Sequence, residues 1–276
     1  MTAARTEAQA GDQSRRQFAV CDRPLALVKR LYGRGVQTRS GAEIVVDGDV
    51  VYKLHRPGTD PRALTTRLRA VAESGFLLSP LATVPEPVGT RWRTRWPRVE
   101  SVVPQPECAP WAEAGRLLAG LHGESSTMRM PHGWPQRLRR MLRTADDTVR
   151  RAAAELPPEV WRAGSPNRPM TLVHGDWHLG QLGRIADAWV LIDVDDLGVG
   201  DPAWDLARPA GFWAAGLIPD DDWAVFLDAY REAGGPAVPS GDPWPALEPF
   251  ARAAVIQAAA HHPDDELLRA ACERMI

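Results

Sequence analysis

The first third of the chain carries short apolar runs that alternate with polar residues, a pattern typical of β-strands. Within residues 42–55, runs rich in β-branched residues at 44–46 and 50–54 flank an Asp-Gly-Asp turn, and this arrangement predicts a β-hairpin. Residues 85–103 alternate Val and Trp with Thr and Arg until a Pro-Gln-Pro sequence at 104–106. We therefore expect two further strands that end at this break.

A helix is predicted between the hairpin and these later strands. Residues 61–74 repeat apolar side chains at helical spacing, with Leu64 and Leu68 on one face. Asp60 is a suitable N-cap, and Pro61 suits the first helical position. The first third of the chain is therefore expected to combine an antiparallel sheet with a helix.

The period of the apolar positions changes after residue 104, where they recur every three to four residues as in amphipathic helices. Two short β-like runs, at 170–173 and 189–192, interrupt this helical part, and each leads directly into an acidic loop. Helices are expected at 110–122, 134–155, 223–233 and 247–260.

This change of pattern predicts an α+β protein with two lobes, a small antiparallel-sheet lobe and a larger, mainly helical one. The joint is expected near residues 100–105. The N-terminus is polar and lacks the apolar core of a secretory signal, so we expect it to be a flexible tail. The expected boundaries are 1–17 for the tail, 18–103 for the N-terminal lobe and 104–276 for the C-terminal lobe.

The composition favours a globular protein with small partners. Of the 276 residues, 44% are hydrophobic and 25% charged, and the formal net charge is -2. The chain contains no basic run that would suit nucleic acid or an anionic membrane. Its long apolar stretches, such as 251–260, fall short of the roughly 20 residues that span a bilayer. We therefore expect a small-molecule partner, and a monomer or a weak homodimer.

The cysteine and lysine content narrows the chemistry further. Cys21, Cys108 and Cys272 are odd in number and widely spaced, which argues against a disulfide framework or a structural zinc site and favours the cytoplasm. Only Lys29 and Lys53 among the 33 basic residues are lysine. Chemistry that needs an ammonium group therefore has two candidates.

The two acidic loops carry a set of residues that suits phosphoryl transfer. The sequence His-Gly-Asp-Trp-His-Leu-Gly-Gln at 174–181 offers Asp176 and Gln181, and Asp193 follows the second β-like run. Phosphoryl transfer needs one carboxylate to orient the attacking hydroxyl and accept its proton, and two oxygen ligands for Mg²⁺. The order and spacing nearly match the catalytic loop and D-F-G aspartate of protein kinases. Here Gly175 replaces the loop arginine, and no Phe-Gly follows the second aspartate.

These motifs, together with Gly-Asp-Pro-Ala-Trp-Asp-Leu-Ala at 200–207, give the chain a resemblance to the aminoglycoside phosphotransferase family, whose members share the protein-kinase-like fold. Val-Tyr-Lys at 51–53 and the helix at 115–122 also look like elements of that family. The resemblance implies ATP, sometimes GTP, as the phosphate donor. It implies Asp176 as catalytic base, Gln181 and Asp193 as Mg²⁺ ligands, and Asp205 as a buried carboxylate that braces the catalytic loop.

The nucleotide is expected to lie between the lobes, held mainly by residues of the N-terminal, nucleotide-binding lobe. Lys53 is placed to hold the α and β phosphates, and its carboxylate partner is left open, with Glu73 on the following helix as one candidate. A P-loop is excluded because glycine precedes neither lysine. The adenine is expected against the backbone near Val99, Glu100 and Val102.

The acceptor is not specified by these motifs. The His-Leu-Gly-Gln form is also similar to actinobacterial sugar kinases, so an aminoglycoside, another antibiotic, an amino sugar or a plain sugar all fit. Acidic runs at 220–222 and 264–266 could attract an amine-bearing acceptor, but they are also typical of helix N-termini.

Two alternative functions fit parts of the sequence. His174, Asp176 and His178 form an H-x-D-x-H pattern that, with Asp193, could hold a hydrolytic metal, although we expect His174 to support the loop backbone. The second alternative is a pseudokinase or nucleotide-binding regulator without turnover. Turnover of ATP that depends on the proposed base would separate the enzyme from the regulator.

Overall fold

The N-terminal part of the structure, a computed structural model, is an antiparallel sheet with the strand order β1-β2-β3-β5-β4. The structure describes residues 36–38, 41–101 and 109–276, and these belong to one unit, Leu31–Ile276. The strands are β1 Val36–Gln37, β2 Glu43–Asp47, β3 Val50–Leu54, β4 Glu86–Val88 and β5 Arg91–Pro97.

Several sequence-based expectations lie outside the described residues. These are the tail at 1–17, the lobe boundary at 103–104 and the adenine contact of Val102, together with Lys29, Cys21 and Cys108.

The predicted hairpin is confirmed by the pairing of β2 with β3. Ile44 lies opposite Lys53 in the register, and Gly48 adopts a φ of 56° in the turn, a left-handed conformation that glycine adopts without a steric cost. The predicted strands after residue 85 are also confirmed, because β5 pairs with both β3 and β4.

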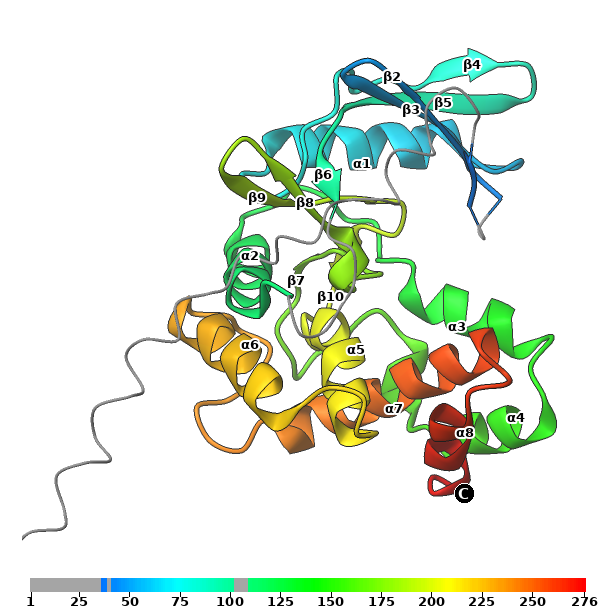
Figure 1. The fold of residues 1–276 in the computed structure, drawn as a ribbon, viewed down its shortest axis with the longest axis vertical. Helices are drawn as coiled ribbons and strands as arrows, with labels where there is room; N and C mark the ends of the chain where they lie inside the picture. The colour runs from blue at the N-terminus through cyan, green and yellow to red at the C-terminus, as the bar shows by residue number, and fades with distance from the viewer. Residues whose placement is uncertain (1–35, 39–40, 102–108) are drawn as a thin grey trace, which may run out of the picture. The chain divides into compact units, whose positions relative to one another are not determined.

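Helix α1, Pro61–Glu73, confirms the predicted helix and packs beside the sheet (Figure 1). The Asp60 side chain accepts a hydrogen bond from the backbone N–H of Arg62 at 2.9 Å and so caps the helix. Leu64, Leu68 and Val71 are buried, as their helical spacing predicts.

Two smaller sheets follow. The β-like runs at 170–173 and 189–192 are confirmed as β7, Thr171–Val173, and β9, Ala188–Leu191. Their partners were not predicted, because these strands are short and rich in glycine. The partner strands are β10, Gly198–Gly200, beside β7, and β8, Leu182–Ile185, which joins β9 to β6, Glu100–Ser101.

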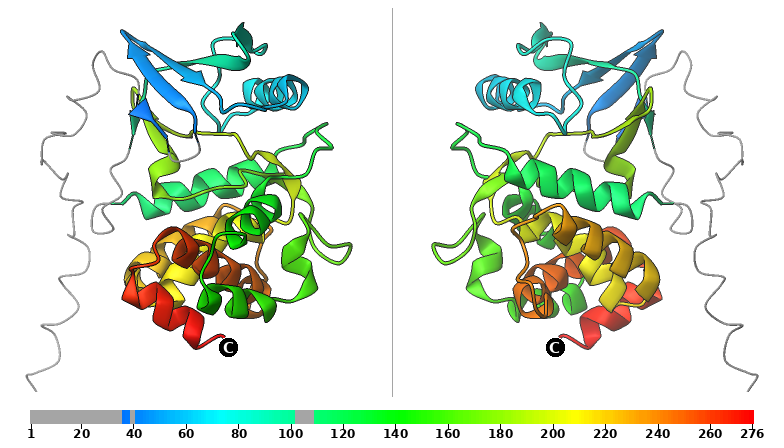
Figure 2. Two further views of the ribbon diagram at one scale, coloured as in Figure 1. Left: turned by 90° about the vertical axis from the view of Figure 1, so that its right-hand side faces the viewer. Right: turned by 90° about the vertical axis from the view of Figure 1, so that its left-hand side faces the viewer.

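The rest of the described chain is mainly helical (Figures 1 and 2). None of its helices is long and apolar enough to cross a membrane. The α-helices are α2 Trp111–Gly123, α3 Trp134–Leu142, α4 Asp147–Ala154, α5 Ala203–Ala214, α6 Asp220–Glu232, α7 Trp244–His261 and α8 Glu266–Glu273, with short 3-10 helices η3 Pro158–Trp161 and η4 Leu179–Gln181.

The prediction of one continuous helix at 134–155 was wrong. The helix breaks between α3 and α4, where the Asp146 side chain accepts a hydrogen bond from the Val149 N–H at 2.9 Å and caps a new helix. Leu138 and Val149 are both buried, so the apolar stripe on which the prediction rested continues across the break.

Glycines allow the main helices to approach closely. A Cβ built on Gly115 of α2 would lie 2.4 Å from the Phe226 carbonyl oxygen of α6, and one on Gly211 of α5 would lie 2.5 Å from the Ala251 carbonyl oxygen of α7. These contacts leave no room for a side chain. They fix the helical core against which the loops described next are placed.

Candidate active site

The carboxylate of Asp205 anchors the loop at 174–181, which we call the H-G-D loop. This carboxylate lies in the first turn of α5, is fully buried, and accepts hydrogen bonds from the backbone N–H groups of His174 at 2.7 Å and Gly175 at 2.9 Å. The φ of Gly175 is 81°, a conformation that favours glycine. The His174 ring donates from Nε2 to the Ile192 carbonyl at 2.8 Å. The residue before Asp193 is therefore tied to the H-G-D loop.

Asp205 itself is held by a buried chain of side chains. His122 Nε2 lies 3.0 Å from Asp205 Oδ2 and donates to it, so His122 Nδ1 is free to accept from the Tyr230 hydroxyl at 2.8 Å. The Tyr230 oxygen in turn accepts from the Ala237 N–H at 3.0 Å. Burial would raise the pKa of Asp205, but hydrogen bonds to His122 and Gly175 hold it below its usual range. The carboxylate is therefore charged and satisfied.

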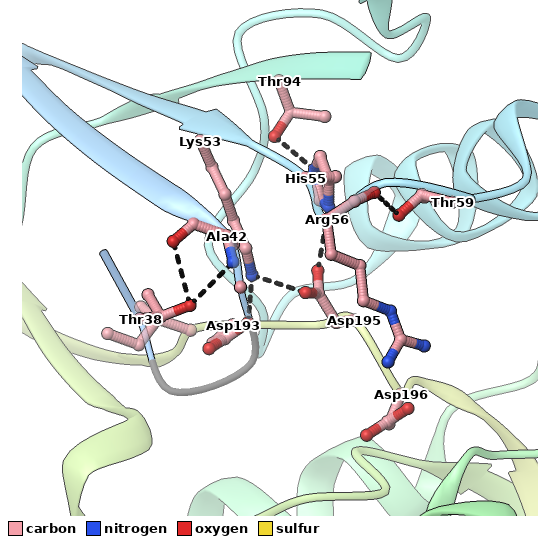
Figure 3. A network of polar contacts seen from close by, with 12 residues as sticks. Thr38, Ala42, Lys53, His55, Arg56, Thr59, Thr94, Asp193, Asp195 and Asp196 are labelled. Atoms are coloured by element: carbon pink, nitrogen blue, oxygen red, sulfur yellow. Dashed lines mark hydrogen bonds and ion pairs between the residues drawn. The ribbon is translucent and has the colours of Figure 1, made fainter. Parts of the chain in front are cut away.

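Lys53 is paired with the segment after β9 (Figure 3). Its Nζ lies 2.5 Å from Asp193 Oδ1 and 2.8 Å from Asp195 Oδ2. Burial would lower the pKa of Lys53, but the two carboxylates outweigh it and raise the pKa above its usual value. Lys53 likewise lowers the pKa of Asp193 against the effect of burial. Glu73, the candidate partner on α1, is instead exposed near the end of that helix.

Asp193 combines backbone strain with an open side chain. Its φ of 62° lies in the left-handed region that non-glycine residues rarely occupy, and such strain clusters at functional sites. Its side chain is 45% exposed although its partner, the Lys53 side chain, is only 10% exposed. The carboxylate therefore keeps a face free for another ligand.

Two further residues contact the segment 195–197, and the sequence reasoning missed both. His55 Nδ1 lies 3.5 Å from Asp195 Oδ1, and His55 Nε2 lies 3.0 Å from the Thr94 hydroxyl. Burial lowers the pKa of His55 to about 4, so the ring is neutral near pH 7. Arg67 of α1 donates from Nε to the Leu197 carbonyl at 2.9 Å. His55 could have been found, because it lies two residues after Lys53. Its N–H donates to the Trp92 carbonyl at 2.8 Å and extends the β3 ladder, which keeps the two side chains on one face.

Asp176 lies between two arginines that were also missed. Arg137 of α3 forms ion pairs with Asp176 and Asp196 through its two terminal nitrogens, and Arg208 Nη2 of α5 lies 3.2 Å from Asp176 Oδ1. Arg208 follows Asp205 by three residues on a helix, a spacing that puts both on one face. Nothing local to Arg137 indicates its role.

Gln181 is buried beside the segment that carries Asp193. Its main-chain carbonyl accepts from the Ile192 N–H at 2.9 Å, and its amide lies 3.2 Å from His178 Nε2. Burial lowers the pKa of His178 to about 4, so the ring is neutral. The Gln181 atom that lies 3.2 Å from this ring is the amide nitrogen. Because His178 Nδ1 accepts from the Gly180 N–H at 3.0 Å, Nε2 carries the ring proton, and the carboxamide accepts that proton only when it turns its oxygen toward the ring.

Of the residues expected near the adenine, Val99 and Glu100 are described, and both lie beside β8. Glu100 pairs with Arg184 of β8 and is exposed. Val99 packs against the backbone of Gly183, where a built Cβ would lie 2.7 Å from Val99 Cγ2.

The hydrolase alternative is not supported by this geometry. His174 Nε2 is used by the Ile192 carbonyl, and across residues 36–38, 41–101 and 109–276 no group of three or more His, Cys, Asp or Glu side chains could hold a metal ion. The acidic runs act as helix-terminal residues. Asp265 caps α8, and Asp220, in the first turn of α6, accepts from the Trp213 indole at 2.7 Å.

A cavity of about 600 Å³ opens beside Asp176, within the size range of small-molecule pockets. Its walls come from the start of α2, from α3, from the H-G-D loop, from α5 with the loop that follows it, and from the end of α7. The candidate base therefore faces a space that could hold an acceptor.

A fold of this kind with such a site defines a class of kinase-like phosphotransferases. The model of the phosphotransferase enzyme family, APH, matches residues 44–250. The chain belongs to this family of small-molecule kinases. A search of the curated proteins found no match.

Several solved structures share the fold. The amicoumacin kinase hAmiN is 16% identical, with a TM-score of 0.61 over 92% of this chain and 93% of that one. A choline/ethanolamine kinase family protein from Mesorhizobium loti is 17% identical, with a TM-score of 0.58 over 91% and 90%. The aminoglycoside phosphotransferase APH(3'')-Id from Streptomyces rimosus is 16% identical, with a TM-score of 0.57 over 81% and 92%. The predicted α+β, kinase-like fold is confirmed.

Proposed function

We propose that this protein transfers the γ-phosphate of ATP, or of GTP, to a hydroxyl group of a small molecule. One observation carries the proposal. The Lys53 pair with Asp193 and the H-G-D loop with Asp176 meet at Ile192, whose carbonyl accepts from His174 at 2.8 Å. A cation for phosphates, a partly exposed carboxylate and a candidate base thus belong to one connected site.

The donor side of the site is assigned to the N-terminal lobe, residues 18–103. Lys53 would bind the phosphates, and Val99, Glu100 and Val102 would border the adenine. Two of the matching structures hold nucleotides, hAmiN with AMP-PNP and Ca²⁺ and a spectinomycin phosphotransferase with ADP. These ligands support a nucleotide site in the same fold.

The residues present fit a magnesium ion. Mg²⁺ is usually held by one or two carboxylates and by substrate phosphates, without a cage of protein ligands. The partly exposed carboxylate of Asp193 and the carboxamide of Gln181 supply hard oxygen ligands of this kind. When bound, the ion would neutralise charge on the phosphates.

The acceptor side is assigned to the C-terminal lobe, residues 104–276. Asp176 would orient the acceptor hydroxyl, whose oxygen forms the new bond to the γ-phosphorus while the bond to the β-γ bridging oxygen breaks. The hydroxyl proton passes to Asp176 and ADP leaves. Asp205 and His174 would hold the H-G-D loop in position for this step. An aminoglycoside, another antibiotic and an amino sugar are the candidate acceptors.

The test is acceptor-dependent ADP release by the purified full chain with Mg-ATP. We expect Asp176→Asn to lower kcat by about a thousandfold or more and to leave ATP binding intact. Asp187→Asn, in the exposed turn between β8 and β9, is the matched control and should keep full activity. ATP binding without acceptor-dependent turnover would favour the pseudokinase alternative, and normal turnover by Asp176→Asn would remove Asp176 from the mechanism.

A further inference from the structure

The cavity beside Asp176 has little negative charge to offer a cationic acceptor. Among the described residues that line it, Asp176 is the sole carboxylate, and Arg137 and Arg208 are the cations. Both arginines already contact Asp176, and Arg137 also pairs with Asp196, so a ligand carboxylate would find each guanidinium group already paired with a carboxylate. None of the acidic residues at 220–222 and 264–266 is among the described residues that line the cavity. A ligand with several ammonium groups would therefore find only one carboxylate in the lining, and that carboxylate is already paired with two guanidinium groups.

The body of the cavity is apolar. Leu179, Phe212 and Leu217 line it and are only partly buried, so they present apolar surface to its interior. Trp111 and Trp177 complete the wall on the side of α2 and the H-G-D loop. Removing such surface from water favours a ligand with an apolar body.

The lining also includes a polar group without a partner among the described residues. Gln257 of α7 lines the cavity and is only 2% exposed, and its Oε1 has no hydrogen-bond partner among the described residues. A buried carboxamide oxygen without a partner is destabilising, and a donor on a ligand would remove that cost. A neutral hydroxyl group supplies such a donor without adding charge.

We propose that the acceptor is an uncharged, hydroxyl-bearing molecule with a largely apolar body, bound between Asp176 and Gln257. This proposal rests on the proposed function, since it names the substrate class of the same site. It distinguishes among the candidate acceptors, because it favours neutral glycoside-like compounds over polycationic aminoglycosides.

The test measures binding to the full chain by calorimetry without nucleotide, so that it does not depend on turnover. Octyl glycosides of glucose, glucosamine and glucuronic acid, used below their micelle concentrations, share one chain and differ in charge. Octyl glucoside is expected to bind at least tenfold more tightly than the other two, and at least tenfold more tightly than ethyl glucoside. Equal or tighter binding of the charged glycosides or of ethyl glucoside, or no binding of octyl glucoside, would overturn the proposal.

A pair of leucine variants separates the cavity from the rest of the surface. Leu217→Glu places a carboxylate in the lining and should weaken octyl glucoside at least tenfold while strengthening the glucosamine derivative. Leu267→Glu, at an exposed leucine of α8 that is 56% exposed, should change neither affinity. An unchanged affinity for both ligands in Leu217→Glu would show that the glycosides bind elsewhere and would refute the proposal.

The outcomes also separate this inference from the proposed function. Release of ADP that requires Asp176 and is stimulated by the polycation neomycin, but not by neutral acceptors, would keep the phosphotransferase and overturn the acceptor class. If the glycosides bind in the expected order but no acceptor stimulates ADP release, the inferred ligand preference of the cavity stands and the proposed phosphotransferase function is overturned.

Discussion

Lys53 Nζ lies 2.5 Å from Oδ1 of Asp193, a residue 140 positions later in the chain. In protein kinases the corresponding lysine pairs with a glutamate of the following helix. Here Asp193 and Asp195 supply both carboxylates, and the following helix α1 contributes Arg67, which binds the Leu197 carbonyl at 2.9 Å. The segment after β9 is therefore linked to the large sheet by the ion pairs of Lys53 and to α1 by the hydrogen bond of Arg67.

The first prediction concerns this pair. Lys53→Met removes the cation between Asp193 and Asp195 and leaves two carboxylates side by side, which repel each other and the phosphates. We expect KM for ATP to rise at least tenfold in steady-state assays. Arg69→Met, at an exposed arginine of α1, is the control. An unchanged KM and kcat for ATP in Lys53→Met would exclude Lys53 from the nucleotide site.

The second prediction concerns Gln181. If its carboxamide oxygen binds Mg²⁺, Gln181→Ala should raise the Mg²⁺ concentration for half-maximal ADP release at least tenfold, and Gln181→Asn should recover part of this loss. His178→Phe removes the ring nitrogen that contacts the carboxamide at 3.2 Å. With Gln181 unchanged, this variant should shift the Mg²⁺ dependence of ADP release. Identical Mg²⁺ curves for wild type and Gln181→Ala would rule out a ligand role for Gln181.

The third prediction concerns Asp205. Asp205→Ala leaves the buried N–H groups of His174 and Gly175 and the His122 ring without their acceptor. We expect a loss of about 3 kcal/mol or more in the free energy of unfolding, measured with urea, because each unsatisfied buried group costs about 1–3 kcal/mol. Asp228→Ala, on the exposed face of α6, should stay within about 0.5 kcal/mol of wild type. Equal stabilities of the two variants would contradict the anchoring role.

The fourth prediction uses two glycines of α2. Gly115→Ala would place a Cβ 2.4 Å from the Phe226 carbonyl oxygen, whereas the Cβ of Gly123→Ala would meet nothing within 4 Å. We expect the first variant to lose about 1–3 kcal/mol because backbone must move, and the second to be neutral or slightly stabilised. Thermal unfolding of both variants tests the close approach of α2 and α6. Matching melting temperatures would show that this approach is not required.

The fifth prediction concerns pH. Burial lowers the pKa of His55 and His132 from 6.5 to about 4, so between these values the unfolded chain binds more protons than the folded one. Stability should therefore fall as the pH drops from about 6.5 to about 4, by up to about 1.4 kcal/mol per pH unit for each histidine. Urea unfolding at pH 7 and pH 5 measures this slope. His132→Gln should flatten it and His262→Gln, at an exposed histidine, should not.

The sequence predicted the elements whose signals are local. The hairpin of β2 and β3 and helix α1 follow from alternation, turn residues and an N-cap, all within a few residues of each other. The break before α4 was missed because Asp146 begins a new helix while the apolar stripe continues. An N-cap residue indicates the start of a new helix, whereas an unbroken apolar stripe indicates one continuous helix. The apolar stripe alone does not reveal which of the two signals determines the structure.

The candidate site could be predicted only in part, because the sequence reveals local patterns and some of the contacts in the site are not local. Asp176, Gln181 and Asp193 are recognised by their spacing within two neighbouring loops. The contacts of Lys53 with Asp195 and of Arg137 with Asp176 join segments that are far apart in the chain. Such contacts depend on how the sheet and helices pack, and no local pattern specifies them.

The buried chain of Tyr230, His122 and Asp205 holds the H-G-D loop, and none of its three members lines the cavity beside Asp176. The walls that would meet an acceptor, such as Phe212 and Leu217, are separate from this support. Substitutions in those walls could thus change which alcohol is accepted without displacing the reactive carboxylate. A scaffold divided in this way lets specificity diverge among relatives while the chemistry stays the same.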